Sequence, residues 1–178
     1  MKYAIVYSLD EDTKRYQNEL VNDISQKFKT KNLNKKINPH ITFKSPFETE
    51  YTGELEKTLD SFTKATKKSK IILNGFGNFE EKVLYINAIF PEKSKKTFRR
   101  FMKSISGLDF VDFNEYDLIE DNFHSTIALP EDRKKFYEIK KYLINEKERP
   151  IFVLDLDNIT IIKKESGLWK DYMRFDIK

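Results

Sequence analysis

Two short segments of the chain share one pattern, and they contain its only two histidines. Residues 40–46 read His-Ile-Thr-Phe-Lys-Ser-Pro, and residues 124–130 read His-Ser-Thr-Ile-Ala-Leu-Pro. Both fit H-x-T-Φ-x-x-P, where Φ is apolar. This internal repeat predicts two similar halves that each present the same segment.

The apolar residues around each histidine predict that both segments are β-strands. Side chains along a strand alternate between its faces, so His40 and Thr42 share one face, as do His124 and Thr126. If the two halves meet about a pseudo-two-fold axis, both strands present these side chains to a shared cleft. Two imidazoles and two hydroxyls then converge on one small volume.

The rest of the sequence alternates between strand and helix patterns. Runs of β-branched and aromatic residues predict strands at 2–9, 40–47, two within 70–90 joined by a turn at 80–82, 108–113, 122–130, 150–164 and 172–177. Apolar residues at three- and four-residue spacing predict helices at 10–29, 54–68, 94–105 and 131–145. We expect loops over 30–38, from 114 through Asp121, and at 165–167. The mixture predicts an α+β fold.

Length and composition limit the classes of protein. A chain of 178 residues without a Pro/Gly/Ser-rich linker predicts one bilobal domain over 1–178. No apolar run approaches the roughly 20 residues that a membrane span needs. The first strand is followed by acidic residues 10–12 rather than by a cleavage site, so we expect a soluble, cytoplasmic protein.

The reactive side chains narrow the chemistry further. The chain has no cysteine, which excludes thiolate nucleophiles and thiolate zinc sites. Its net charge of +4 favours an anionic ligand over a cationic one.

Imidazole, with a pKa of about 6.5, can accept or donate a proton near neutral pH, so two histidines can serve as the acid and the base of phosphoester cleavage. We assign His124 as the base and His40 as the acid, with Thr42 and Thr126 bonding the phosphate oxygens. The scheme requires no metal or other cofactor.

These features together resemble the two-histidine (2H) phosphoesterase superfamily, which includes bacterial 2'-5' RNA ligase-like proteins and 2',3'-cyclic phosphodiesterases. The resemblance rests on both H-x-T segments, on NGFGNFEEKVLYI after the first, and on GLW and MRFDI near the end of the chain. It implies two pseudo-symmetric βα lobes with antiparallel-rich sheets around a central active-site cleft. It also implies that His40 and His124 are catalytic and that Thr42 and Thr126 bind phosphate.

Other side chains are candidates for contacts with the substrate. Lys44 lies at an even offset from His40 and could meet a phosphate, although a solvated surface lysine would fit equally. An aromatic side chain could stack on a base or simply pack in the core; these candidates are Tyr7, Phe79, Tyr85 and Trp169. Arg133 could contact an anion at a helix start.

Three functions fit the pattern. The first is metal-independent hydrolysis of a 2',3'-cyclic phosphate or a related RNA or nucleotide phosphodiester. The second is 2'-5' RNA ligation, or cleavage of a cyclic oligonucleotide, by the same four residues. The third is an RNA-binding module that retains the cleft without turnover, for which two duplicated titrating groups would be unnecessary. We expect a monomer whose partner is an RNA or nucleotide phosphodiester. Two structural alternatives also stand: each histidine could be a core residue, or both could bind zinc with carboxylates from elsewhere.

Overall fold

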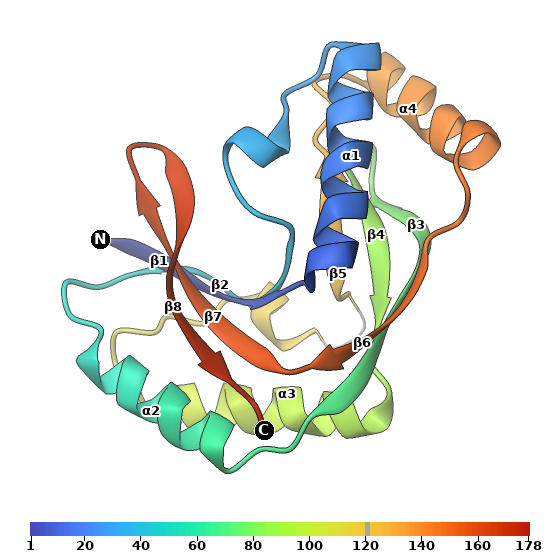
Figure 1. Ribbon diagram of the computed structural model, residues 1–178. Helices are drawn as coiled ribbons and strands as arrows, with labels where there is room; N and C mark the ends of the chain where they lie inside the picture. Colours follow the sequence, from blue (N-terminus) through green and yellow to red (C-terminus); the bar gives the residue numbers. More distant parts are fainter. Residues whose placement is uncertain (120–121) are drawn as a thin grey trace.

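The computed structural model describes residues 1–119 and 122–178, and it contains two antiparallel four-stranded sheets (Figure 1). The first sheet has the order β2 (His40–Glu48), β1 (Lys2–Ser8), β7 (Asn158–Glu165) and β8 (Leu168–Asp176). The second sheet has the order β5 (His124–Ala128), β4 (Val83–Ile89), β3 (Ser69–Phe79) and β6 (Ile151–Leu156). Each H-x-T segment therefore lies on an edge strand, and β2 and β5 contact each other.

In the described part of the chain, four α-helices and two short 3₁₀ helices connect the strands. They are α1 (Glu11–Phe28), η1 (Leu33–Lys35), α2 (Gly53–Lys64), α3 (Glu92–Ile105), η2 (Glu115–Leu118) and α4 (Arg133–Glu146). The side chain of Asp10 accepts a hydrogen bond from the backbone N–H of Thr13, which caps the start of α1. The α+β class and the four predicted helices are confirmed. None of the described helices is long and apolar enough to cross a membrane.

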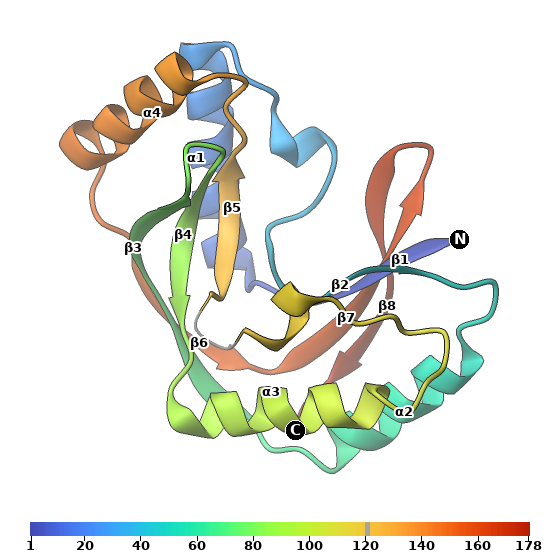
Figure 2. The same cartoon turned by 180° about the vertical axis from the view of Figure 1, so that it is seen from behind.

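Both halves contain the same strand–helix–strand connection, but the helix of each half packs against the motif strand of the other half. The chain runs β1–α1–β2 in the first half and β4–α3–β5 in the second. Yet α1 lies against β5, and α3 lies below β2 in the other half (Figures 1 and 2). The ring of Phe43 on β2 packs 5.5 Å from Phe98 and 5.6 Å from Phe101, both on α3. Each motif strand is thus supported by the helix that belongs, by sequence, to the other half.

Two predicted strands were wrong. Residues 108–113 form turns and coil, because Val111 is buried and Phe110 and Phe113 pack against the core without a neighbouring strand. Residues 150–164 form two strands in different sheets, because the chain leaves β6 at Asp157 and enters β7 at Asn158. The sequence does not reveal this change of sheet, because both β6 and β7 contribute apolar side chains to the core and so form one continuous apolar run.

Two predicted loops contain short helices. The loop over 30–38 includes η1, and the loop that ends at Asp121 includes η2. The last two residues of that acidic loop, 120 and 121, lie outside the described residues.

Candidate active site

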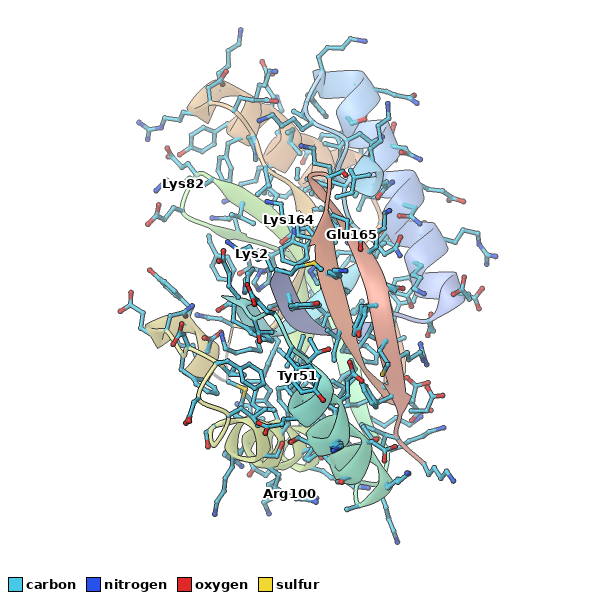
Figure 3. The ribbon with its side chains drawn as sticks, turned by 90° about the vertical axis from the view of Figure 1, so that its left-hand side faces the viewer. Lys2, Tyr51, Lys82, Arg100, Lys164 and Glu165 are labelled. Carbon is cyan, nitrogen blue, oxygen red and sulfur yellow. The ribbon has the colours of Figure 1, made fainter. Side chains whose placement is uncertain are left out.

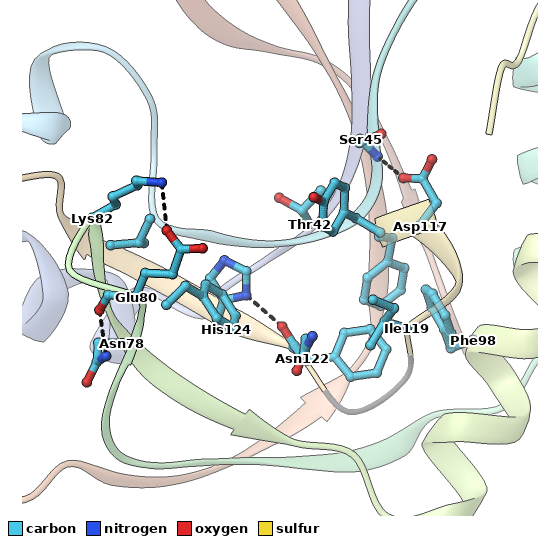
Figure 4. Close-up of a pocket in the computed structure, with 15 residues that line it drawn as sticks. Thr42, Ser45, Asn78, Glu80, Lys82, Phe98, Asp117, Ile119, Asn122 and His124 are labelled. Carbon is cyan, nitrogen blue, oxygen red and sulfur yellow. Dashed lines mark hydrogen bonds and ion pairs between the residues drawn. The ribbon is translucent and has the colours of Figure 1, made fainter. Parts of the chain in front are cut away.

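The two H-x-T motifs converge on one cleft. It consists of a larger cavity of about 580 Å³ and a smaller one of about 270 Å³, which share His124, Phe79 and Val83. Thr42 and His124 line the larger cavity (Figure 4). His40 and Thr126 line the smaller one. The structure therefore brings all four motif residues to the same cleft.

Both imidazoles are held in the same way by the backbone. His40 Nδ1 lies 2.7 Å from the carbonyl oxygen of Asn38, and His124 Nδ1 lies 2.6 Å from that of Asn122. A carbonyl oxygen can only accept, so each Nδ1 carries the proton and each neutral ring leaves Nε2 as an acceptor. A histidine that accepts a proton through Nε2 must carry its own proton on Nδ1. The same hydrogen bond, to the carbonyl oxygen two residues earlier, favours this tautomer at both His40 and His124.

Sequence reasoning missed this contact, although a signal for it was present. The repeat extends two residues towards the N-terminus, since Asn38-Pro39-His40 and Asn122-Phe123-His124 both read N-x-H. The hydrogen bond uses the backbone oxygen of each asparagine. The longer repeat therefore indicates that the backbone has the same conformation before each histidine. It does not indicate a role for the asparagine side chains in this hydrogen bond.

The pKa of both histidines is lowered from the ordinary value of 6.5. Burial is the main cause for His40, and the neighbouring charge of His124 lowers its pKa further, whereas the Asn38 carbonyl and the Asp171 carboxylate raise it. Burial also lowers the pKa of His124, and the Asn122 carbonyl opposes the shift. Each imidazole therefore favours the neutral form more than a histidine in water does.

Aromatic rings surround His124. Its ring lies 4.7 Å from that of Phe79, in an edge-on arrangement, and 5.0 Å from that of Tyr85. The side chain of Tyr85, on β4, lies over Gly77 on the neighbouring strand β3. A Cβ added at Gly77 would lie 2.4 Å from the tyrosine ring, so the ring requires glycine there. Of the predicted stacking residues, Phe79 lines both cavities and Tyr85 supports His124 from the side.

Gln17 connects α1 to the second motif strand, a role that sequence reasoning missed. Its buried amide donates to the carbonyl oxygen of Thr126 at 3.0 Å and accepts from the hydroxyl of Ser125 at 2.8 Å. These two bonds lie immediately after His124 and fix β5 against the helix. A polar residue on the buried face of α1 was the available signal.

Lys44 does not reach the cleft, so its prediction as a phosphate contact was wrong. Val6 pairs with Thr42 and Ile5 pairs with Lys44, which leaves Phe43 as an extra residue in a β-bulge. The alternation of faces fails there, and the Lys44 side chain is 0% exposed.

The ammonium of Lys44 is paired with the carboxylate of Asp117 at 2.9 Å, and the Asp117 side chain is 2% exposed. Asp117 also accepts from the backbone N–H groups of Ser45, at 2.8 Å, and Asn114, at 2.9 Å. Burial alone would raise the pKa of Asp117, but these hydrogen bonds outweigh it and the pKa is lowered. The ion pair attaches η2, which precedes β5, to β2.

Three further predicted contacts lie away from both cavities. Tyr7 is buried, its hydroxyl donates to the Asp155 carbonyl oxygen at 2.8 Å, and burial raises its pKa. The guanidinium of Arg133 is paired with Glu81 at 2.8 Å on the surface. The indole of Trp169 packs against a small cluster of Ala4, Val6 and Ile162. Their packing and pairing explain why these side chains do not contribute to the cleft.

The zinc alternative requires carboxylates beside the histidines. Within residues 1–119 and 122–178, no group of three or more His, Asp or Glu side chains is placed to hold a metal ion.

Comparison with known proteins gives a family and a fold. The model of the 2'-5' RNA ligase superfamily matches residues 11–168. A comparison with curated proteins finds no match. Among solved structures, the chain is similar to TT0787 of Thermus thermophilus, with a TM-score of 0.65, 12% identity, and 99% of this chain and 98% of that chain covered.

Two further structures share the fold. E. coli LigT complexed with 3'-AMP has a TM-score of 0.60 at 12% identity, with 99% of this chain and 97% of that chain covered. Usb1 of Kluyveromyces marxianus has a TM-score of 0.52 at 9% identity, with 99% and 97% covered. The family match spans both H-x-T strands and every connecting helix. The chain therefore belongs to the 2'-5' RNA ligase superfamily of two-histidine phosphoesterases.

Proposed function

We propose that the protein is a metal-independent phosphodiesterase that hydrolyses 2',3'-cyclic phosphates or related RNA and nucleotide phosphodiesters. The observation that carries the proposal is the paired placement of His40 and His124 on facing edge strands, each with Nδ1 bonded to a carbonyl oxygen. Each imidazole thus offers Nε2 for proton transfer. A site that only binds RNA would not need this duplication.

In the proposed mechanism, His124 Nε2 takes a proton from water as the water oxygen attacks phosphorus. The bond from phosphorus to one ribose oxygen breaks, and protonated His40 donates its Nε2 proton to that oxygen. The hydroxyls of Thr42 and Thr126 hydrogen-bond the non-bridging oxygens and hold the phosphate in line. Burial lowers the pKa of both imidazoles, so the pH profiles of the single-histidine variants, rather than the direction of these shifts, test the choice of His40 as the acid.

The same residues can act on other diesters. With a ribose hydroxyl in place of water as the nucleophile, the scheme describes 2'-5' ligation, and with an internal linkage it describes cleavage of a cyclic oligonucleotide. The match to the 2'-5' RNA ligase superfamily supports ligation as a second candidate, whereas cleavage of a cyclic oligonucleotide follows only from the same four residues. We also propose that the chain acts as a monomer on its RNA or nucleotide substrate, because one chain provides both motifs.

The test is turnover of a panel of substrates with EDTA present. The panel contains nucleoside 2',3'-cyclic phosphates, a short RNA with a cyclic end, and cyclic oligonucleotides. We expect turnover of at least one class at a rate that EDTA does not change. Inertness towards every member would favour the RNA-binding module, and loss of activity that added divalent metal restores would contradict metal independence.

The pH dependence of kcat/KM follows from the lowered pKa of both histidines. Turnover needs one neutral and one protonated imidazole, and this state is most populated between the two pKa values. Since both lie below 6.5 in the free enzyme, we expect a bell-shaped profile with its maximum below pH 6.5. Bound phosphate should raise both values, so the kcat profile should peak at higher pH than the kcat/KM profile. A kcat/KM maximum above pH 6.5 would contradict this prediction.

A further inference from the structure

Basic residues are concentrated in two segments of the chain. Residues 64–70 and 92–103 contain ten Lys and Arg residues but a single acidic residue, Glu92. The net charge of the whole chain is only +4, so the rest of the protein is net acidic. The positive charge is therefore distributed very unevenly along the chain.

The fold brings these two segments together. The guanidinium of Arg100, on α3, donates to the carbonyl oxygen of Ala65 at 3.4 Å. The hydroxyl of Ser94, near the start of α3, donates to the hydroxyl of Ser69 at 2.8 Å. The helices α2 and α3 contact each other and lie on the same side of the protein (Figures 1 and 2). The two basic segments thus contribute to one surface.

Four of the cations form a row along the outer face of α3. Their three- and four-residue spacing places them on one face of the helix, and all four are exposed. They are Lys93, Lys96, Arg100 and Lys103. Over this stretch the helix rises about 15 Å. The opposite face of α3 is buried and contributes Phe98 to the wall of the larger cavity.

Most of these cations have no acidic partner. Three of the ten are paired with carboxylates. Within the described part of the chain, six others form no ion pair, and we call these six the basic surface: Lys67, Lys68, Lys93, Lys96, Arg100 and Lys103. In Figure 3, Arg100 lies at the opposite end of the molecule from Lys82. A row of unpaired cations favours a polyanion, because each contacted phosphate releases condensed counterions.

Two observations favour RNA as this polyanion. No aromatic or other large apolar side chain of residues 64–70 or 92–103 is exposed, so the surface has nothing to insert into a membrane. Moreover, the basic row and Phe98 lie on opposite faces of one helix, which is about 10 Å thick. A phosphodiester chain with its end in the cleft therefore needs only to pass around α3 to reach the basic surface.

We propose that the basic surface binds the sugar–phosphate backbone of an RNA whose end is held in the cleft, and that it favours polymeric RNA over single nucleotides. The inference rests on the proposed function for the identity of the polyanion, because the cleft is proposed to act on RNA or nucleotide phosphodiesters. A surface of cations without exposed rings contacts the backbone rather than the bases. Binding should therefore be independent of sequence and should include base-paired stems.

The experiment compares two labelled RNAs by fluorescence anisotropy: a short single strand, and a hairpin stem that carries the same strand as its 3' end. We expect the wild type to bind the RNA with the stem roughly 10-fold or more tightly than the single strand. Lys96→Gln/Lys103→Gln should lose most of this ratio. The slope of log affinity against log salt concentration should also decrease in magnitude by about two, because each lost phosphate contact lowers it by about one. Arg100 is retained because it also contacts Ala65.

Lys134→Gln/Lys141→Gln on α4 is the matched control. It removes two exposed lysines with the same seven-residue spacing from a helix at the other end of the protein (Figure 1). The control should retain both the ratio and the salt slope. An unchanged ratio in the α3 variant, or an equal loss in the control, would overturn the inference. Sedimentation with phosphatidylserine vesicles tests the membrane alternative: vesicle binding that is lost in the α3 variant while its RNA ratio is unchanged would overturn the inference in favour of a membrane.

Turnover of nucleoside 2',3'-cyclic phosphates separates this inference from the proposed function. The α3 variant should hydrolyse them as the wild type does, because the basic surface lies outside the cleft. Turnover by a wild type that gains no affinity from the stem would support the proposed function and overturn the basic surface. A protein inert towards all cyclic phosphates, with stem binding that depends on Lys96 and Lys103, would support the basic surface and contradict the proposed function.

Discussion

His124→Ala is expected to lower kcat/KM for the best substrate of the panel by about 10²- to 10⁴-fold, and His40→Ala by a similar factor. The range is that of a single general acid or base. Because the two imidazoles serve one proton-transfer sequence, the double variant should lose much less than the product of the two single losses. Steady-state kinetics with the three variants measures both effects.

The pH profile of each variant identifies the role of the missing group. If His124 is the base, His124→Ala loses the acidic limb of the bell, and its residual activity depends only on protonation of His40. Asn122→Ala is the control, because Nδ1 of His124 bonds the backbone oxygen, which the substitution retains. A basic limb lost in His124→Ala would reverse the assignment, and wild-type activity in either histidine variant would exclude the mechanism.

Asp117→Ala is expected to lower the free energy of unfolding by about 3–5 kcal/mol, because it leaves the ammonium of Lys44 buried without its partner. The double variant Lys44→Met/Asp117→Leu removes both charges and should regain most of this loss, since apolar residues of similar size can replace a buried pair. Urea denaturation of the wild type, Asp117→Ala and the double variant measures the free energies.

The pH dependence gives an independent check on the ion pair. The pKa of Asp117 is lowered in the folded state, so its contribution to stability is present above the ordinary aspartate pKa and is lost as the pH falls through the folded value. The double variant should lose less stability on acidification than the wild type does. If Asp117→Ala were as stable as the wild type, the predicted cost of leaving Lys44 buried without its partner would be contradicted.

The sequence predicted the cleft because the information for it is local. Alternation along two short strands is enough to place each threonine beside its histidine, and the repeat indicates that the strands have equivalent surroundings. In the structure, the two histidines and the two threonines line the two adjoining cavities of one cleft. Their catalytic roles stay predictions that the histidine variants test.

What the sequence could not give depends on contacts between distant residues. A single bulge at Phe43 removes Lys44 from the cleft, and nothing in the segment Phe-Lys-Ser-Pro marks that extra residue. The partner of Lys44 is Asp117, far along the chain in a segment that was predicted as a loop. Likewise, the apolar run over 150–164 contains no signal that it leaves one sheet for the other.

The exchange of helices between the halves determines how a local change will spread. Gln17, near the N-terminus, bonds β5 directly after His124, whereas Phe98 and Phe101 in the second half pack on β2 directly after Thr42. Neither half, expressed as a fragment, would therefore contain the support of its own histidine. The two fragments would have to associate to restore both contacts. A substitution in α1 that disturbs Gln17 is therefore expected to change the position of His124 on β5.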